Sequence, residues 1–114
     1  MAQKQEHGAK KRRRQFRELA GLAYRRELEE ALGQLEASFK AWRSGEIGPF
    51  ELSDRIHKFH NGPSRELWST YESLDAEMSV PLAFVRGVLK EEDVPPELLE
   101  QLRRTAELHR LPDD

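Results

Sequence analysis

Residues 16–42 decide the fold, and they read FRELAGLAYRRELEEALGQLEASFKAW. This stretch contains no proline and is rich in residues with high helix propensity, so it predicts one long helix. At about 100° per residue, most of its apolar side chains fall within a single arc about 100° wide. They are Tyr24, Leu28, Ala31, Leu32, Leu35, Phe39 and Trp42. This arc is the face that we expect the helix to bury.

The first turns of the same helix carry a second apolar patch, formed by Phe16, Leu19, Ala20 and Ala23. It lies about 120° around the helix from the centre of the first arc, and Gly21 sits close to the change of phase. Either Gly21 bends the helix so that both faces reach one core, or a separate partner buries the patch. We expect self-association through this patch, because homo-oligomers usually close by pairing the same surface.

Turn signals divide the rest of the chain into shorter helices. Glycine favours the position after a helix, so we expect helix ends at Ser44-Gly45 and at Asn61-Gly62. The fourth helix, expected to run from about residue 79 to 90, has the widest apolar arc and is predicted to be the most buried. New helices are predicted to start near Pro49, Pro63, Ser79 and Pro96. The predicted fold is all-α, a small helical bundle with one long N-terminal helix and about four shorter helices.

Charge is distributed unevenly along the 114 residues, although the formal net charge is only −2. Positive side chains crowd the start of the chain, and no apolar period precedes Phe16. We therefore expect residues 1–15 to be a basic flexible N-terminal arm and residues 16–114 to be a single helical domain. The clustered cations are Lys10, Lys11, Arg12, Arg13, Arg14 and Arg17.

This cationic cluster is open to three interpretations. It is an inert solubilising segment, it docks on an acidic partner protein, or it binds nucleic acid. Adjacent cations repel one another, and phosphates would relieve that repulsion while releasing counterions. The rest of the chain is acidic, which argues against a broad nucleic-acid-binding surface.

A polar corner between the second and third expected helices predicts an anion or partner site. The start of a helix has free N–H groups, and Ser64 and Arg65 would offer theirs beside the imidazole of His60. A purely structural corner is the alternative, because histidines in a last helical turn complement the helix dipole. His57 and His60 lack further ligands, so no metal is expected. Asn61 completes this group of residues.

Composition and motifs narrow the function. The chain contains no cysteine, which removes disulfides, thiolate nucleophiles and zinc fingers. It lacks the motifs of a phosphate-binding loop or a serine hydrolase, and no apolar run reaches the about 18 residues of a membrane span. We expect a cytoplasmic, non-enzymatic protein-interaction module without a cofactor, with a protein partner or a homodimer. The alternative is a nucleic-acid-associated protein anchored by residues 10–17.

Overall fold

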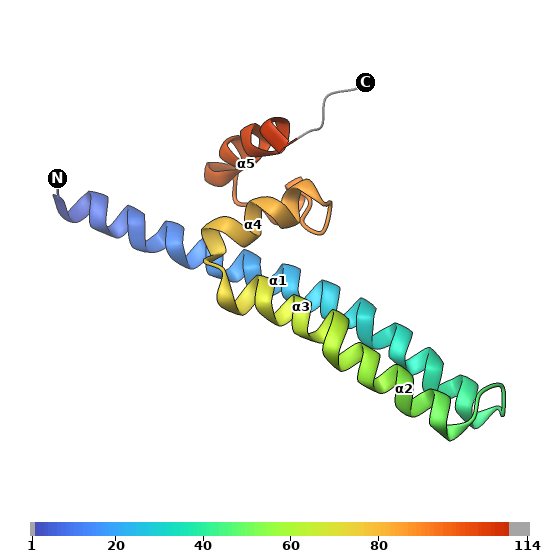
Figure 1. Ribbon diagram of the computed structural model, residues 1–114. Helices are drawn as coiled ribbons and strands as arrows, with labels where there is room; N and C mark the ends of the chain where they lie inside the picture. Colours follow the sequence, from blue (N-terminus) through green and yellow to red (C-terminus); the bar gives the residue numbers. More distant parts are fainter. Residues whose placement is uncertain (1, 110–114) are drawn as a thin grey trace. The chain divides into compact units, whose positions relative to one another are not determined.

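The computed structural model describes the backbone of residues 2–109 and the side chains of residues 8–109. The regular structure in this part of the chain is helical throughout, so the predicted all-α class is confirmed. η1 and η2 are π-helical and η3 is a single 3-10 turn. In chain order the elements are α1 (Ala2–Arg43), α2 (Pro49–Phe59), η1 (His60–Ser64), α3 (Arg65–Trp68), η2 (Ser69–Ser73), α4 (Ala76–Val85), η3 (Glu91–Asp93) and α5 (Pro96–His109) (Figure 1).

The chain divides into two compact units that share α1. Unit one combines Met1–Ala23 with Leu74–Asp114, and unit two is Tyr24–Ser73. The single domain expected over residues 16–114 stays a prediction.

α1 begins much earlier than the sequence pattern suggested. It is helical from Ala2 and passes without interruption through Gly21 to Arg43. The segment that we expected to be a flexible arm is therefore the start of a helix, and the expected boundary at residue 15 lies inside it. The prediction of a flexible arm relied on the lack of an apolar period before Phe16. Lys, Arg, Gln and Ala nevertheless favour a helix even where no face is buried.

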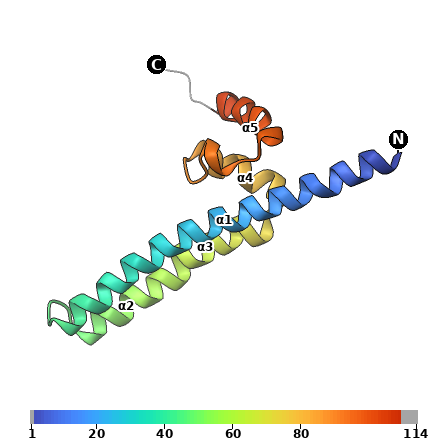
Figure 2. The ribbon, with the colours of Figure 1, turned by 180° about the vertical axis from the view of Figure 1, so that it is seen from behind.

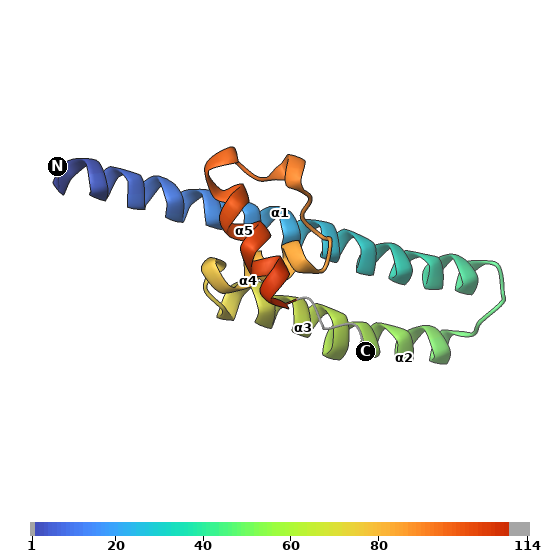
Figure 3. The ribbon, with the colours of Figure 1, turned by 90° about the horizontal axis from the view of Figure 1, so that it is seen from above.

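Unit two is an antiparallel helical hairpin, visible from three sides in Figures 1, 2 and 3. Its first arm is the second half of α1, and its second arm runs without a break from Pro49 to Ser73. The predicted stop at Asn61-Gly62 and restart at Pro63 are therefore wrong. Pro63 has no N–H, and in an α-helix its ring would collide with the carbonyl of Phe59. The wider π-helical turn of η1 accommodates the ring and lets the helix continue.

The loop of the hairpin begins where the sequence predicted. The N–H of Gly45 donates to the carbonyl of Trp42 at 3.1 Å, and the N–H of Glu46 donates to the carbonyl of Ala41 at 2.8 Å. Together these bonds form a Schellman motif, which satisfies the last carbonyls of α1. Gly45 has a φ of 82°, a left-handed conformation that is unfavourable for residues with a Cβ. The predicted helix end at Ser44-Gly45 is confirmed.

Unit one builds its core from the first turns of α1 and from the C-terminal helices. α4 and α5 pack against each other. The buried apolar side chains of this unit are Phe16, Leu19, Ala20, Ala23, Val80, Ala83, Leu89, Val94, Leu98 and Leu102.

α4 differs from the prediction in where it starts and ends. It starts after Asp75, a residue type favoured at the N-cap, and ends at Val85, with Pro81 inside it. Ser79, Val80 and Ala83 are its buried residues, whereas Met78 is 58% exposed. Among the described residues α4 has a larger share of buried residues than α1, α2, α3 or α5, so the prediction that it is the most buried helix is confirmed, although Leu82 and Val85 of its apolar arc are partly exposed.

An ion pair between η3 and α5 lowers the pKa of an exposed carboxyl group in unit one. Glu91 accepts N–H groups of Arg103 at 2.5 and 3.1 Å. The hydrogen bond from Arg103 lowers the pKa of Glu91 below its ordinary value of 4.5, its positive charge lowers it further, and partial desolvation opposes the shift. A carboxyl group with a lowered pKa stabilises the folded state above its unfolded-state pKa, and the contribution is lost as the pH falls through the folded-state pKa.

We therefore expect Arg103→Gln to destabilise the protein at neutral pH and to matter progressively less as the pH is lowered through the pKa of Glu91. Urea unfolding of wild type and variant over this pH range measures the difference in unfolding free energy. Arg104→Gln is the matched control, because it removes the neighbouring exposed cation of α5. A difference between wild type and Arg103→Gln that does not change with pH would contradict the prediction.

Candidate interaction surfaces

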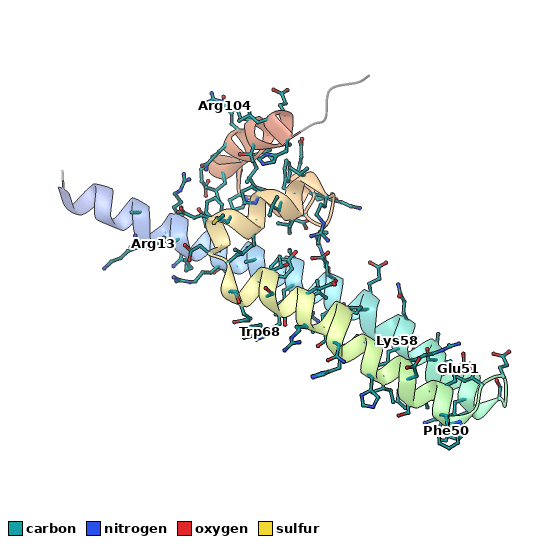
Figure 4. All side chains as sticks on the ribbon, viewed as in Figure 1. Arg13, Phe50, Glu51, Lys58, Trp68 and Arg104 are labelled. Atoms are coloured by element: carbon teal, nitrogen blue, oxygen red, sulfur yellow. The ribbon has the colours of Figure 1, made fainter. Side chains whose placement is uncertain are left out.

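Five of the six cations of the cationic cluster are exposed on the N-terminal half of α1. Lys10, Lys11, Arg13, Arg14 and Arg17 are exposed and together line one shallow hollow. Figure 4 labels Arg13 on this part of the helix. The structure therefore brings these five predicted site residues together on one surface.

Arg12 has a different surrounding from the other cations. It is half-buried, and its guanidinium lies 5.2 Å from the centre of the Phe16 ring, one helical turn further along α1. A cation over an aromatic face is attracted by the ring's quadrupole, so this contact holds Arg12 against the core of unit one.

The patch that we assigned to self-association belongs to the core instead. Phe16 is 1% exposed and Leu19 4% exposed, and Ala20 and Ala23 are also buried. The premise that this patch is left uncovered by its own chain is therefore wrong. The change of phase at Gly21 does mark a different set of neighbours, because residues 1–23 form one compact unit with residues 74–114 of the same chain. We do not propose association through these four residues.

The polar residues of the predicted anion site do not lie at a turn between two helices. His57, His60, Asn61, Ser64 and Arg65 lie on the continuous second arm of the hairpin. The backbone N–H of Arg65 donates to the carbonyl of Gly62, so it is not free to bind an anion as the N–H at the start of a helix would be. The continuation of the helix through Pro63 removes the physical basis of the predicted site.

The two arms of the hairpin touch along one side of α1. The rings of Tyr24 and Tyr71 stack with their centres 5.2 Å apart, and the hydroxyl of Tyr71 donates to the carboxylate of Glu27. Nearer the loop, the guanidinium of Arg55 donates to the hydroxyl of Ser38 at 3.2 Å. These contacts place Tyr24, Glu27 and Ser38 on the side of α1 that the second arm covers.

The next side of α1 carries an apolar stripe that the second arm covers only in part. Its members follow one another at alternating intervals of four and three residues, the spacing of a coiled-coil interface. Leu32 is 45% exposed and Trp42 41% exposed, and the other three side chains are half-buried. We call this set the α1 stripe; it consists of Leu28, Leu32, Leu35, Phe39 and Trp42.

A hollow beside the α1 stripe has the layout of a coiled-coil hole. In a coiled coil, each such side chain of one helix enters a space between four residues of the facing helix. Four residues that line the hollow have the spacing of such a set: Leu32, Leu35, Glu36 and Phe39. Lys40 and Arg43 line it as well. Four residues at this spacing form the lining that a coiled-coil hole requires.

The second arm has an apolar stripe of similar spacing, with intervals of four, three, four and four residues. Ile56 is exposed, whereas Phe59 and Leu67 are half-buried and Leu52 is buried. A second hollow, lined on this arm by Arg55, Lys58, Phe59 and Pro63, is lined on α1 by Ala31, Gln34, Leu35 and Ser38. Leu35 thus borders both hollows of the hairpin. The second-arm stripe consists of Leu52, Ile56, Phe59, Pro63 and Leu67.

Two further surface aromatics flank the hairpin. Phe50 and Trp68 are exposed and project from the second arm in Figure 4. Helical spacing predicts that Trp68 lies on the inner side of the helix expected from Pro63, and its exposure of 57% shows that this prediction is wrong. The partial exposure of the α1 stripe was also missed, although the alternating spacing of four and three residues was a usable signal for it.

Residues 8–109 contain no group of three or more His, Cys, Asp or Glu side chains that could hold a metal ion. No helix in the described residues is long and apolar enough to cross a membrane.

Comparisons of the sequence with protein-family models and with curated proteins, and of the fold with solved structures, found no match.

Proposed function

We propose that this protein is a non-enzymatic, cytoplasmic interaction module that associates with a second copy of itself through the hairpin of residues 24–73. The observation that carries the proposal is the α1 stripe, which remains substantially open although α1 is already paired with the second arm. Leucine, phenylalanine and tryptophan side chains in water are unfavourable, and burying one such side chain contributes about 1.5–3 kcal/mol.

A second hairpin is the partner that best fits this hairpin, because each of its two arms carries an apolar stripe. Two antiparallel helices enclose their apolar faces on one side only, whereas four helices enclose a complete core. Two identical hairpins related by a twofold axis would bring the stripes of both arms into one four-helix bundle. A single partner helix would leave part of these stripes in water.

The charges beside the α1 stripe also suit pairing with an identical surface. A surface that binds its own copy must be self-complementary, so a strongly one-signed rim would oppose it. Here both signs alternate: Arg25 pairs with Glu29 at 3.1 Å, and Lys40 pairs with Glu36 at 3.9 Å. In an antiparallel pairing of the two α1 helices, Glu29 of one copy would approach the end of α1 that carries Arg43 in the other.

The mass in solution tests the proposal directly. We expect light scattering of the full chain to show a mass that rises with concentration from 13.3 kDa toward twice that value. Reversible dilution should return the smaller mass, because the association rests on burial rather than on a covalent link. A mass that stays at 13.3 kDa up to the highest accessible concentration would overturn the proposal.

A further inference from the structure

We propose that residues 10–17 of α1 bind the phosphate backbone of double-stranded nucleic acid without recognising its sequence. The binding surface is the cationic face of α1, formed by Lys10, Arg13, Arg14 and Arg17. This inference concerns unit one and is independent of the association proposed for the hairpin.

The helix turns a charge cluster into an ordered row. The four residues are spaced i, i+3, i+4 and i+7, so their side chains lie within about 100° of one another around α1. At about 1.5 Å per residue they extend for roughly 10 Å along the helix axis. Because the backbone is already ordered in the helix, binding restricts only the side chains.

Little of this positive charge is neutralised by the side chains of residues 8–109. Arg14 approaches Glu18 at 3.8 Å, a long contact between exposed side chains. Neighbouring Lys11 contributes only a minor part of the lowered pKa of Glu97, which arises first from the hydrogen bond donated by Gln15. Arg13 and Arg17 have no ion-pair partner among the side chains of residues 8–109. The adjacent cations repel one another, and a phosphate row relieves that repulsion with release of counterions.

The chemistry of the face favours phosphate over an acidic protein surface. Three of its four cations are arginines, whose planar guanidinium donates two parallel N–H groups to a phosphate. Protein interfaces are enriched in apolar and aromatic anchors, and the described side chains of this face are all cationic.

A membrane surface and single strands are also poorer fits. A helix that lies on a bilayer inserts an apolar face, but the apolar residues of these turns, Phe16 and Leu19, are buried in the core of unit one. Single strands are bound through stacking of bases on exposed aromatic rings, and Phe16 is not accessible for stacking. A duplex backbone requires neither.

The test measures binding of the full chain to a fluorescent mixed-sequence DNA duplex by anisotropy over a series of salt concentrations. We expect weak binding that falls steeply with salt and does not depend on sequence. Arg13→Gln with Arg17→Gln should lower the log–log salt slope by about 0.9 per arginine, so by about 1.8 for the pair. Glutamine keeps helix propensity and removes only the charge.

The matched control is Lys58→Gln with Arg104→Gln, which changes the net charge equally by removing two exposed helical cations that already have ion-pair partners. An unchanged slope in this control together with the reduced slope in the arginine variant supports the proposal. No binding at the lowest salt, or equal slopes in both variants, would overturn it. Equally tight binding to polyglutamate or to phosphatidylserine vesicles would also overturn it, in favour of an acidic protein or a lipid surface.

Discussion

Replacing Leu19 with glutamate is expected to unfold unit one or to destabilise it by at least about 3 kcal/mol. Leu19 is 4% exposed, and the buried side chains of its unit are almost all apolar. An ionised carboxylate there would lose its hydration without gaining a partner, and a neutral one would still leave a buried polar group unsatisfied. Urea unfolding followed by circular dichroism measures the loss.

Leu108→Glu is the matched control, because it introduces the same charge on α5 at a residue that is 84% exposed. We expect it to change the unfolding free energy by no more than about 0.5 kcal/mol. A Leu19→Glu protein that stays as stable as wild type but has half its mass would contradict the expectation. It would mean that the patch around Leu19 pairs between copies after all.

The long helix was the most predictable element, for a physical reason. From Leu28 to Trp42 the apolar residues repeat with a helical period, and no proline or pair of glycines interrupts the run. The helix end at Gly45 was equally predictable, because a Schellman motif requires a residue in the left-handed backbone conformation, which glycine adopts most easily. Both features are set by neighbouring residues alone.

The second arm of the hairpin was misread because a local stop signal was overridden. Asn61-Gly62-Pro63 is a common way to end one helix and begin another, and propensity alone favours that interpretation. In the structure, contacts on both sides of this segment keep the arm straight: Arg55 bonds to Ser38 before it, and Tyr71 stacks on Tyr24 after it. Contacts between residues far apart in sequence decide this region, and no local pattern contains them.

For the patch at the start of α1, the helical period predicted the buried face but not the residues that bury it. The phase change near Gly21 correctly indicated that Phe16 and Leu19 face different neighbours from Leu28 and Leu35. A helical period identifies which face is buried but not what buries it. Burial by the C-terminal helices of the same chain and burial by a second copy would produce the same apolar pattern. The residues that bury this patch could therefore not be assigned from the sequence.

Replacing Leu32 with glutamate is expected to keep the protein folded and to abolish its association. Leu32 lies on the α1 stripe and is 45% exposed, so a charge there remains hydrated in the single chain. In a twofold dimer each substitution acts twice. Losing the burial of two leucines at about 1.5 kcal/mol each should weaken association by about 100-fold or more. Light scattering at a concentration at which wild type has the doubled mass measures the effect.

Ala37→Glu is the matched control, because Ala37 lies on the same helix and is exposed on the face opposite the α1 stripe. It adds the same charge and should leave the mass of the associated form unchanged. If both variants lowered the mass alike, net charge and not the stripe would govern association, because added like charges repel between copies wherever they lie. If neither did, the hairpin would not be the associating surface, and a dimer would have to form through another part of the chain. Only the difference between Leu32→Glu and Ala37→Glu assigns the association to the side of α1 that the second arm leaves open.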